Sequence, residues 1–445
     1  MHLLRFTFEN HRSFRDEATL DLTRPTLKTL RPSKGTTWAD HIHHVDGIYG
    51  ANASGKTNVL DALHYMLSAI YGSATSWLEN NHFPRKPFAL DNESEEAPSS
   101  YELEFVHDNI RYEYKFTATN EGILDEVLYE VGQKWRKVFS RSSDGHVNGL
   151  PGLPRVAKRE LALSRAGQLG FTKAHPVWAG IMNGFDIYRV GERKIRNRIN
   201  SIAKQLRDHN MDLNELITLA RIADTGITDI EIEEPDLPPE VADAIKKLFI
   251  KKSSTQRVTR EGKTQTGSQN TKEDLADIIA PNLLFHHGKS GRTLEEDDES
   301  TGTLAWLALG MAAIDALKEG QVLVVDELGS SLHPQLSHMI IDWFEDRTVN
   351  TTGAQLIFTS HDMTLLNIGR GTKANREQIW FVEKSRHGTS ELFCLSDFSL
   401  QKGSNIVKQY MEGRFGAVPY TISSFVHYLL DDNKHPCLHQ RHGDA

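Results

Sequence analysis

The sequence predicts a mixed α/β fold that contains a parallel sheet and is interrupted by a mainly helical insertion. A glycine-rich stretch, residues 50–57, separates a short apolar run from a stretch with helical spacing of apolar residues. Two later apolar runs, residues 321–327 and 355–362, end in polar side chains. Such runs are typical of buried parallel strands, whose carboxyl ends bind ligands in open α/β sheets. Residues from about 155 to 250 have mainly helical spacing.

The glycine-rich stretch fits the phosphate-binding pattern Gly-x-x-x-x-Gly-Lys-Ser/Thr without a mismatch. Val45–Tyr49 before it predicts a strand, and residues 58–67 after it predict a helix. This arrangement turns several backbone N–H groups towards one anion. We expect Lys56 to meet the β- and γ-phosphates of ATP and the Thr57 hydroxyl to bind Mg²⁺. A chance match in a glycine turn is the alternative. The expected ATP-binding residues are Gly50, Asn52, Ala53, Ser54, Gly55, Lys56 and Thr57.

The second apolar run ends in two acidic residues, Asp326 and Glu327. We expect Asp326 to join Thr57 in holding Mg²⁺, and Glu327 to polarise the attacking water as general base. A core strand that simply ends in a polar turn would give the same pattern. The acidic pair therefore indicates an ATP site only in combination with the phosphate-binding stretch.

The third apolar run leads into His361. We expect this side chain to contact the γ-phosphate and to sense whether it is present. A lone histidine after a strand is more often a simple loop residue. Its position after Asp326 in the chain is what favours the functional interpretation.

A fourth element, residues 299–303, precedes an apolar helix that begins at residue 304. Serine and glycine before a helix form an anion site, although helix capping alone would explain them equally well. Gly302 lies one helix and a turn before Asp326. The candidate residues of this element are Ser300, Gly302 and Thr303.

In this order, the four elements resemble the head of an ABC-type ATPase. Residues 3–14 resemble the opening strand and nucleotide-contacting turn of SMC-like and recombination-repair ATPases, which implies that Arg12 and Ser13 contact ATP. Residues 326–334 resemble the Walker B motif and D-loop of the OLD-like branch. Segments within 379–419 resemble a group of prokaryotic ATPases often found in abortive-infection and anti-phage operons. The implied D-loop residues are Ser331, Leu332 and His333.

The resemblance implies an α/β, ABC-type (SMC-like) P-loop ATPase head with an inserted mainly helical domain. In this family the nucleotide lies between two heads, so the signature residues would act in trans on the ATP of a second copy. At least a homodimer is therefore implied. The sequence departs from the family at two places: the Leu-Ser-Gly-Gly-Gln signature survives only as Ser300 and Gly302, and His333 replaces the usual D-loop aspartate. The Q-loop glutamine is not assigned.

Composition agrees with a cytoplasmic enzyme that does not contact membranes. The chain has 445 residues, of which 38% are hydrophobic and 25% charged. No apolar run approaches the length of a membrane span, and no signal core opens the chain. Two cysteines, Cys394 and Cys437, form no disulfide framework. The net charge of −9 excludes a global basic field that would attract nucleic acid.

We expect three regions. Residues 1–150 form the N-terminal lobe of the head, residues 151–280 form the helical insertion, and residues 281–445 form the C-terminal lobe. Within the insertion, residues 251–274 predict a mobile polar loop. We expect this insertion to read a partner or a trigger.

Local basic clusters are the only expected route to nucleic acid. One lies in the polar loop and the other in residues 189–198, although a solvated face balanced by Glu192 is the better interpretation. The histidine-containing tail, residues 435–442, has no second half of a metal site and is expected to be a disordered end.

The remaining chain after His361 leaves no room for the nuclease domain of full OLD enzymes. We therefore expect an ATP-hydrolysing sensor or gating subunit of an anti-phage, abortive-infection type system. It would control a separate effector chain, a nuclease or a toxin, through ATP-dependent dimerisation. The alternative is a DNA repair or recombination ATPase that acts on DNA ends with a partner nuclease. A scaffold that binds ATP without turnover is a third class, against which Glu327 argues.

Overall fold

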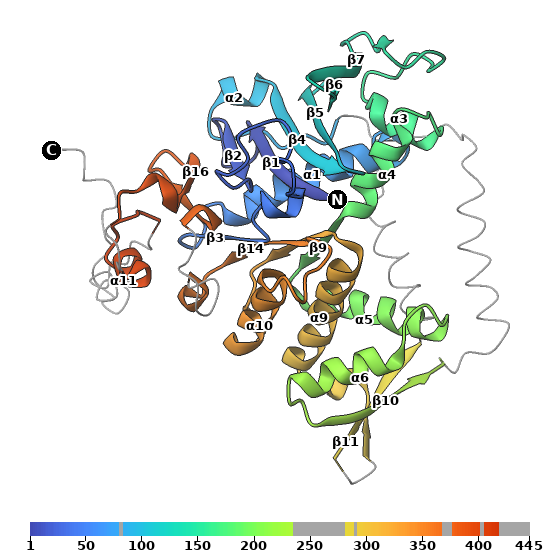
Figure 1. Ribbon diagram of the computed structural model, residues 1–445, viewed down its shortest axis with the longest axis vertical. Helices are drawn as coiled ribbons and strands as arrows, with labels where there is room; N and C mark the ends of the chain where they lie inside the picture. Colours follow the sequence, from blue (N-terminus) through green and yellow to red (C-terminus); the bar gives the residue numbers. More distant parts are fainter. Residues whose placement is uncertain (80–82, 235–280, 289–291, 367–375, 401–404, 418–445) are drawn as a thin grey trace, which may run out of the picture.

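The structure is a computed structural model, shown in Figure 1. It describes residues 1–79, 83–234, 281–288, 292–366, 376–400 and 405–417. The expected polar loop at 251–274 and the tail at 435–442 lie outside the described residues.

Seven strands form an antiparallel sheet: β1 (His2–Glu9), β2 (Ala18–Asp21), β4 (Ser99–His107), β5 (Ile110–Thr119), β6 (Gly122–Val131), β7 (Trp135–Arg141) and β8 (Val147–Asn148). They lie in the order β2-β1-β4-β5-β6-β7-β8. Burial alternates along β5, because one face of the sheet packs on the core and the other faces solvent. The β4–β5 pair confirms the hairpin that the alternation in residues 101–117 predicts.

Six strands form the second sheet: β3 (Val45–Tyr49), β9 (Phe185–Arg189), β13 (Val322–Asp326), β14 (Gln355–Ser360), β15 (Ile379–Lys384) and β16 (Ser390–Cys394). They lie in the order β16-β15-β3-β14-β13-β9, and all pairs are parallel except β15–β16. β3 and β14 are buried along their whole length, as strands between two layers should be, and the polar side chains in them are buried too. The strands predicted from the three apolar runs are confirmed.

The helix α1 (Lys56–Gly72) lies between the two sheets (Figure 1). Its apolar side chains share one core with the antiparallel sheet and with the facing side of the parallel sheet. Two further helices pack against α1 on the same side of the parallel sheet: α3 (Ala162–Gln168) and α4 (His175–Gly184).

Helices α9 (Thr301–Glu319) and α10 (Pro334–Glu345) cover the other face of the parallel sheet, where a second core forms (Figure 1). α9 begins where the Ser300 hydroxyl accepts a hydrogen bond from the Thr303 backbone N–H, and it ends at Gly320, whose φ is 66°. The remaining short helices are α2 (Asn92–Glu96), α11 (Ile406–Met411) and the 3-10 helices Trp38–Asp40, Ser76–Glu79, Glu296–Asp298, Met363–Leu366, Arg376–Gln378 and Leu395–Asp397.

Residues 151–189, the first part of the expected insertion at 151–280, pack with the two sheets of the head. β8 belongs to the antiparallel sheet, α3 and α4 pack on α1, and β9 pairs with β13. Helical spacing in residues 155–185 does not reveal which body a helix packs against, so the sequence placed this stretch in the insertion. The elements that follow β9 are α5 (Glu192–Arg207) and α6 (Leu213–Ile222), which pack against α9, and the three-stranded sheet of β10 (Ile227–Glu233), β11 (Asn282–His287) and β12 (Arg292–Leu294). The expected domain boundaries at residues 151 and 280 stay predictions.

Register brings the carboxyl ends of four parallel strands to one edge. Tyr49 at the end of β3 pairs with Ser360 of β14, and Asp326 at the end of β13 pairs with Arg189 of β9. The loops that carry the predicted motifs leave the sheet at this edge. Across the described part of the chain, no helix combines the length and hydropathy that crossing a bilayer requires.

Candidate functional site

The phosphate-binding loop follows β3 and ends where α1 begins at Lys56. Gly55 has a φ of 114°, a conformation that side chains disfavour. A Cβ at Gly55 would lie 2.7 Å from Ser13 Oγ and 2.6 Å from Ser390 Oγ, so the loop needs glycine there for space as well. Ser390, at the start of β16, also donates to the Ser54 carbonyl oxygen at 2.6 Å. The loop is thus braced from behind by two serine hydroxyls.

Lys56 is only 5% exposed, and its ammonium group donates to the carbonyl oxygens of Gly50 at 2.8 Å and Ala51 at 2.9 Å. Burial lowers the pKa of Lys56 to about 8, and the nearby carboxylates of Glu327 and Asp326 act against this shift. A buried ammonium group that is held by neutral carbonyls is well suited to pair with an anion. The position matches the role predicted for Lys56.

Asp326 and Thr57 lie next to each other although they are far apart in the chain. Thr57 Oγ1 donates to Asp326 Oδ1 at 3.1 Å, and Thr359 Oγ1 donates to the same oxygen at 2.7 Å. Thr57 opens α1, Asp326 ends β13 and Thr359 belongs to β14, so three elements meet at one carboxylate. Hydroxyl and carboxylate oxygens are the ligands that Mg²⁺ takes from P-loop proteins.

Glu327 follows Asp326 with a φ of 57°, which is uncommon for a residue with a side chain. Its backbone N–H donates to Thr359 Oγ1 at 2.7 Å, which holds this conformation. The Glu327 carboxylate lies 4.0 Å from His361 Nε2, and His361 Nδ1 lies 3.3 Å from Lys56 Nζ. Burial, together with the charge of Lys56, lowers the pKa of His361, so its ring is neutral near pH 7. The three predicted motifs therefore converge.

A cavity of about 650 Å³ opens between these residues, within the range of about 300–1,000 Å³ that ligand pockets show. The residues present fit ATP and Mg²⁺: an anion cradle, a buried ammonium group and two adjoining oxygen ligands meet there. Lys56 and the loop would hold the phosphates, and Thr57 with Asp326 would hold Mg²⁺, which would supply electrostatic stabilisation at the phosphates. Glu327 can accept a proton from water in this cavity. The cavity is lined by Asn52, Ala53, Gly55, Lys56, Thr57, Asn58, Glu327 and His361.

The two N-terminal candidates, Arg12 and Ser13, lie next to the phosphate-binding loop and α1, and their contact with ATP stays a prediction. The Ser13 hydroxyl is buried behind the loop, where it accepts from Asn58 Nδ2 at 2.7 Å and shares a 2.7 Å hydrogen bond with Ser390 Oγ. The Arg12 guanidinium donates to the Asp61 carboxylate on α1. Neither residue lines the cavity in the described structure. Ser13 supports the loop from outside, and Arg12 is held beside the site.

The signature residues lie at the start of α9, and none of them lines the cavity that the described residues form. A Cβ at Gly302 would lie 3.4 Å from the carbonyl oxygen of Ser331, so the signature and the D-loop adjoin each other. His333 caps α10, since its Nδ1 accepts from the Gln335 backbone N–H at 3.3 Å. Action on the ATP of a second copy stays a prediction for Ser300, Gly302 and Thr303, and the D-loop assignment stays a prediction for Ser331, Leu332 and His333.

Four residues that support or adjoin this site carry no recognisable signal in the sequence. Thr359 lies inside a buried apolar run, Ser390 stands in a short strand with no motif, and Asp61 lies inside a helical pattern. Arg189 was noted only as part of a basic cluster. Its register opposite Asp326 could be found only from the strand pairing. Across the described residues, no cluster of three or more histidine, cysteine or acidic side chains could hold a metal ion by itself.

Comparison with solved structures gives low sequence identity and low TM-scores. An SMC head bound to the C-terminal winged-helix domain of ScpA is 14% identical with a TM-score of 0.44, over 90% of this chain and 99% of that one. An SMC head from Pyrococcus furiosus with an extended coiled coil, bound to the C-terminal domain of ScpA, is 14% identical with a TM-score of 0.40, over 93% and 99%. The ATP-bound recombination mediator RecF is 12% identical with a TM-score of 0.29, over 88% and 97%.

No curated protein sequence matches this chain. A protein-family model does, over residues 47–367, from β3 through the phosphate-binding loop to the residues after His361. This range contains every motif that lines the cavity, and it spans well over half of the 445 residues. The chain therefore belongs to the family described as "AAA domain, putative AbiEii toxin, Type IV TA system".

Proposed function

We propose that this protein is an ATP-hydrolysing sensor or gating subunit that works as a dimer and controls a separate effector. The observation that carries the proposal is the convergence of Lys56, Thr57, Glu327 and His361 on one cavity, with Asp326 hydrogen-bonded to Thr57 at its edge. This set supplies a phosphate cradle, oxygen ligands for Mg²⁺ and a base for water. The neutral ring of His361 lies beside Lys56 and Glu327. These groups account for phosphate binding, Mg²⁺ binding and activation of the attacking water within one copy of the chain.

Dimerisation is proposed because the signature residues of the same chain lie outside this cavity. A second copy would bring its α9 N-terminus to the ATP of the first, with ATP enclosed between them. The adjoining D-loop, at Ser331, would lie in the same contact. Opening and closing of the dimer would then report the state of the nucleotide to a partner.

A mixing experiment tests action in trans. Lys56→Ala removes ATP binding, and Gly302→Asp places a negative charge on the signature, where the nearest described neighbour of an added Cβ lies at an ordinary 3.4 Å. Each variant alone should be inactive. Mixed heterodimers keep one intact site, so an equal mixture should recover roughly a quarter of the parental ATPase rate. An inactive mixture would contradict action in trans, provided that the variants exchange subunits.

An anti-phage role of the abortive-infection type is supported by the family description, which names a putative toxin and a toxin–antitoxin system. Cells that carry this chain with its gene neighbours should survive phage challenge as a population, and protection should require both Lys56 and the neighbouring effector. The purified chain alone should leave plasmid DNA uncut in the presence of ATP with Mg²⁺ or Mn²⁺. Protection by the chain without any neighbour would contradict a separate effector.

A DNA repair ATPase is the competing function, and the cationic side chains beside Asp61 favour it to a limited degree. Sensitivity of a deletion strain to DNA breaks, without any change in phage sensitivity, would support this function instead.

The segment at 251–274, which the sequence predicts to be a polar loop, stays a proposed surface for recognition of a partner or trigger. Deletion of residues 253–270 should preserve ATP hydrolysis and abolish the biological output.

A further inference from the structure

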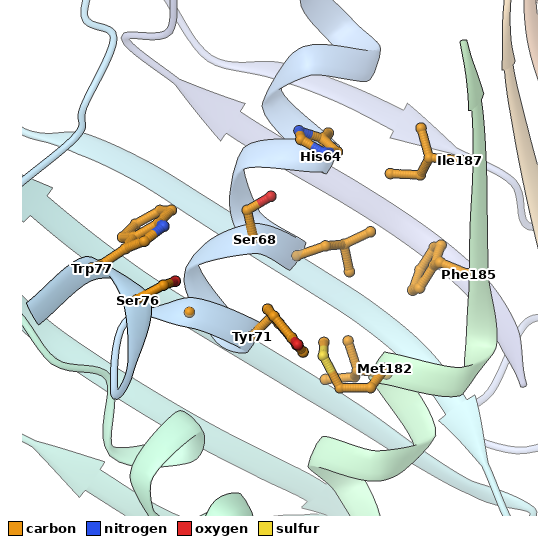
Figure 2. A pocket seen from close by; sticks show the side chains of 11 residues that line it. His64, Ser68, Tyr71, Ser76, Trp77, Met182, Phe185 and Ile187 are labelled. Carbon is orange, nitrogen blue, oxygen red and sulfur yellow. The ribbon is translucent and has the colours of Figure 1, made fainter. Parts of the chain in front are cut away.

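A groove runs along α1 on the side that faces β9, apart from the ATP cavity (Figure 2). From α1, Ser68 and Tyr71 border it, and from β9, Phe185 and Ile187 point towards α1. Met182 closes one end from α4. The groove has a volume of about 400 Å³, within the range of about 300–1,000 Å³ for ligand-binding pockets. Its lining is mainly apolar.

The spacing of both elements explains why one continuous groove forms. On α1, His64, Ser68 and Tyr71 recur at intervals of one helical turn, and on β9, Phe185 and Ile187 alternate to one face. Tyr71 is 64% exposed, which is unusual for so large an aromatic side chain among the described residues. An exposed aromatic group beside an apolar groove is typical of a surface that binds another molecule.

The same two periodicities continue towards the ATP cavity and end in a cationic cluster. Asp61 precedes His64 by one turn of α1, and Arg189 follows Ile187 on the same face of β9. Lys86 Nζ lies 3.1 Å and Arg189 Nη2 lies 3.7 Å from the Asp61 carboxylate, which also accepts from Arg12. Three cations surround one carboxylate, so positive charge is in excess at this end.

Each of these three cationic side chains is about two-fifths exposed, so each can meet a further anion. The positive field reaches the groove itself. Burial is the main cause that lowers the pKa of His64 to about 4, and the charge of Arg189 adds to the shift. A neutral His64 therefore stands between an apolar floor and a cationic end.

We propose that this groove docks an extended segment of a partner protein, in which two or three apolar side chains are followed by an acidic residue. The apolar side chains would lie between α1 and β9, and the acidic residue would meet Lys86 and Arg189. Charge complementarity favours an acidic segment, and the mainly apolar lining favours protein over nucleic acid. If the proposed function holds, the effector is the expected partner.

The location gives a reason for docking to be coupled to ATP. Asp61 lies one turn after Thr57 on α1, and Arg189 pairs with Asp326 across β9 and β13. One wall of the groove, α1, therefore contains Thr57, and the other wall, β9, pairs with the strand that contains Asp326. A small shift of α1 against β9 on nucleotide binding would change the width of the groove and the arrangement of its cations.

A peptide selection tests the proposal with the full chain. Peptides of about twelve random residues are displayed and selected on the parental protein, with counter-selection on Ser68→Trp, which fills the groove. Enriched peptides should carry aromatic or aliphatic residues beside Asp or Glu. Binding of a labelled peptide, measured by fluorescence anisotropy, should weaken at least about tenfold in Tyr71→Ala. Met411→Ala is the matched control, because Met411 on α11 is 67% exposed, and it should bind normally.

Charge reversal tests the cationic end. Lys86→Glu should weaken binding of the acidic peptide. It should strengthen binding of the same peptide in which the acidic residue is replaced by lysine. Circular dichroism and ATP hydrolysis of Tyr71→Ala check that the fold and the ATP site are intact. No enriched peptide, or equal binding by Tyr71→Ala and the parent, would overturn the proposal. Binding of a short DNA duplex that is lost in Lys86→Glu, without any enriched peptide, would also overturn it and assign nucleic acid to the cluster.

The outcome is separable from that of the proposed function. A Tyr71→Ala variant that loses the peptide but still protects cells from phage would support the docking groove and contradict its use by the effector. A variant that loses both, while it still hydrolyses ATP, would support the groove as the effector's docking site.

Discussion

The Thr359 hydroxyl donates a 2.7 Å hydrogen bond to Asp326 Oδ1 and also accepts one, at 2.7 Å, from the backbone N–H of Glu327. One buried side chain on β14 thereby fixes both acidic residues that end β13. The orientation of the Asp326 carboxylate and the left-handed backbone of Glu327 depend on the same oxygen atom. The neighbouring strand therefore helps to set the geometry of the candidate ATP site.

Replacement of Thr359 by valine should uncouple this arrangement. Valine keeps the shape but removes the hydroxyl, which leaves a buried N–H without its acceptor and costs about 1–3 kcal/mol of unfolding free energy. The ATPase rate should fall more than the affinity for ATP, because the phosphate cradle is untouched. Thr359→Ser keeps the hydroxyl and serves as control. Equal rates in the valine and serine variants would contradict the role of the hydroxyl.

Replacement of Lys56 by alanine should abolish ATP binding. The Lys56 ammonium group is the buried cation at the phosphate cradle. Its charge-assisted hydrogen bond to a phosphate is stronger than a hydrogen bond between neutral groups. Calorimetry should show a loss of at least about tenfold in affinity. Lys134→Ala changes an exposed lysine and is the matched control. Parental affinity in Lys56→Ala would show that the motif does not bind ATP.

Replacement of Glu327 by glutamine should preserve ATP binding and slow hydrolysis by about a hundredfold or more, since the base is lost while the shape remains. ATP-bound dimers should then accumulate, which light scattering after gel filtration detects. Glu391→Gln, at an exposed acid on β16, is the control. Hydrolysis at the parental rate would exclude Glu327 as the base.

Replacement of Gly55 by alanine should damage the ATP site more than its backbone conformation alone explains. The new Cβ would meet Ser13 Oγ and Ser390 Oγ at under 3 Å, in addition to the strain of a φ of 114°. Gly35 has a φ of 91° with no described atom near its Cβ position, so Gly35→Ala isolates the backbone strain, about 1–2 kcal/mol. The temperature of thermal unfolding and the affinity for ATP should both be lower in Gly55→Ala than in Gly35→Ala. Equal losses would show that the serine brace is unimportant.

Replacement of Asp46 by asparagine should raise stability at neutral pH. Asp46 on β3 is fully buried; Trp380 Nε1 donates to its Oδ1 at 3.4 Å, and its Oδ2 has no hydrogen-bond partner among the described residues. Burial raises the pKa of Asp46 well above its ordinary value of 3.8. The protonated acid is therefore favoured in the folded state, and its contribution, complete below pH 3.8, is lost as pH rises towards the raised pKa.

The Asp46→Asn variant should lack this pH-dependent loss. Chemical unfolding at several pH values should show a flatter profile above pH 4 than the parent, whereas the exposed control Asp125→Asn should follow the parent. A steeper decline in Asp46→Asn would contradict a neutral, buried Asp46.

The sequence by itself determined the α/β class, the strands at residues 45–49, 322–326 and 355–360, and the residues at the centre of the ATP site. The reason is local. A phosphate-binding loop needs glycines, lysine and threonine at fixed spacing, and buried parallel strands need continuous apolar runs, so both leave a pattern in adjacent residues. His361, Asp326 and Glu327 could be predicted because each follows such a strand.

Only the tertiary structure decided which distant residues support and border that site. Ser13 and Ser390 brace the loop, Thr359 fixes the acidic pair, and Asp61 pairs with Arg12, all through contacts between residues far apart in the chain. Residues 185–189 belong by sequence to the expected insertion, but their pairing with β13 places them in the head and sets Arg189 opposite Asp326. Such pairings depend on how elements pack, and side-chain spacing along one element carries no information about its neighbour across the sheet.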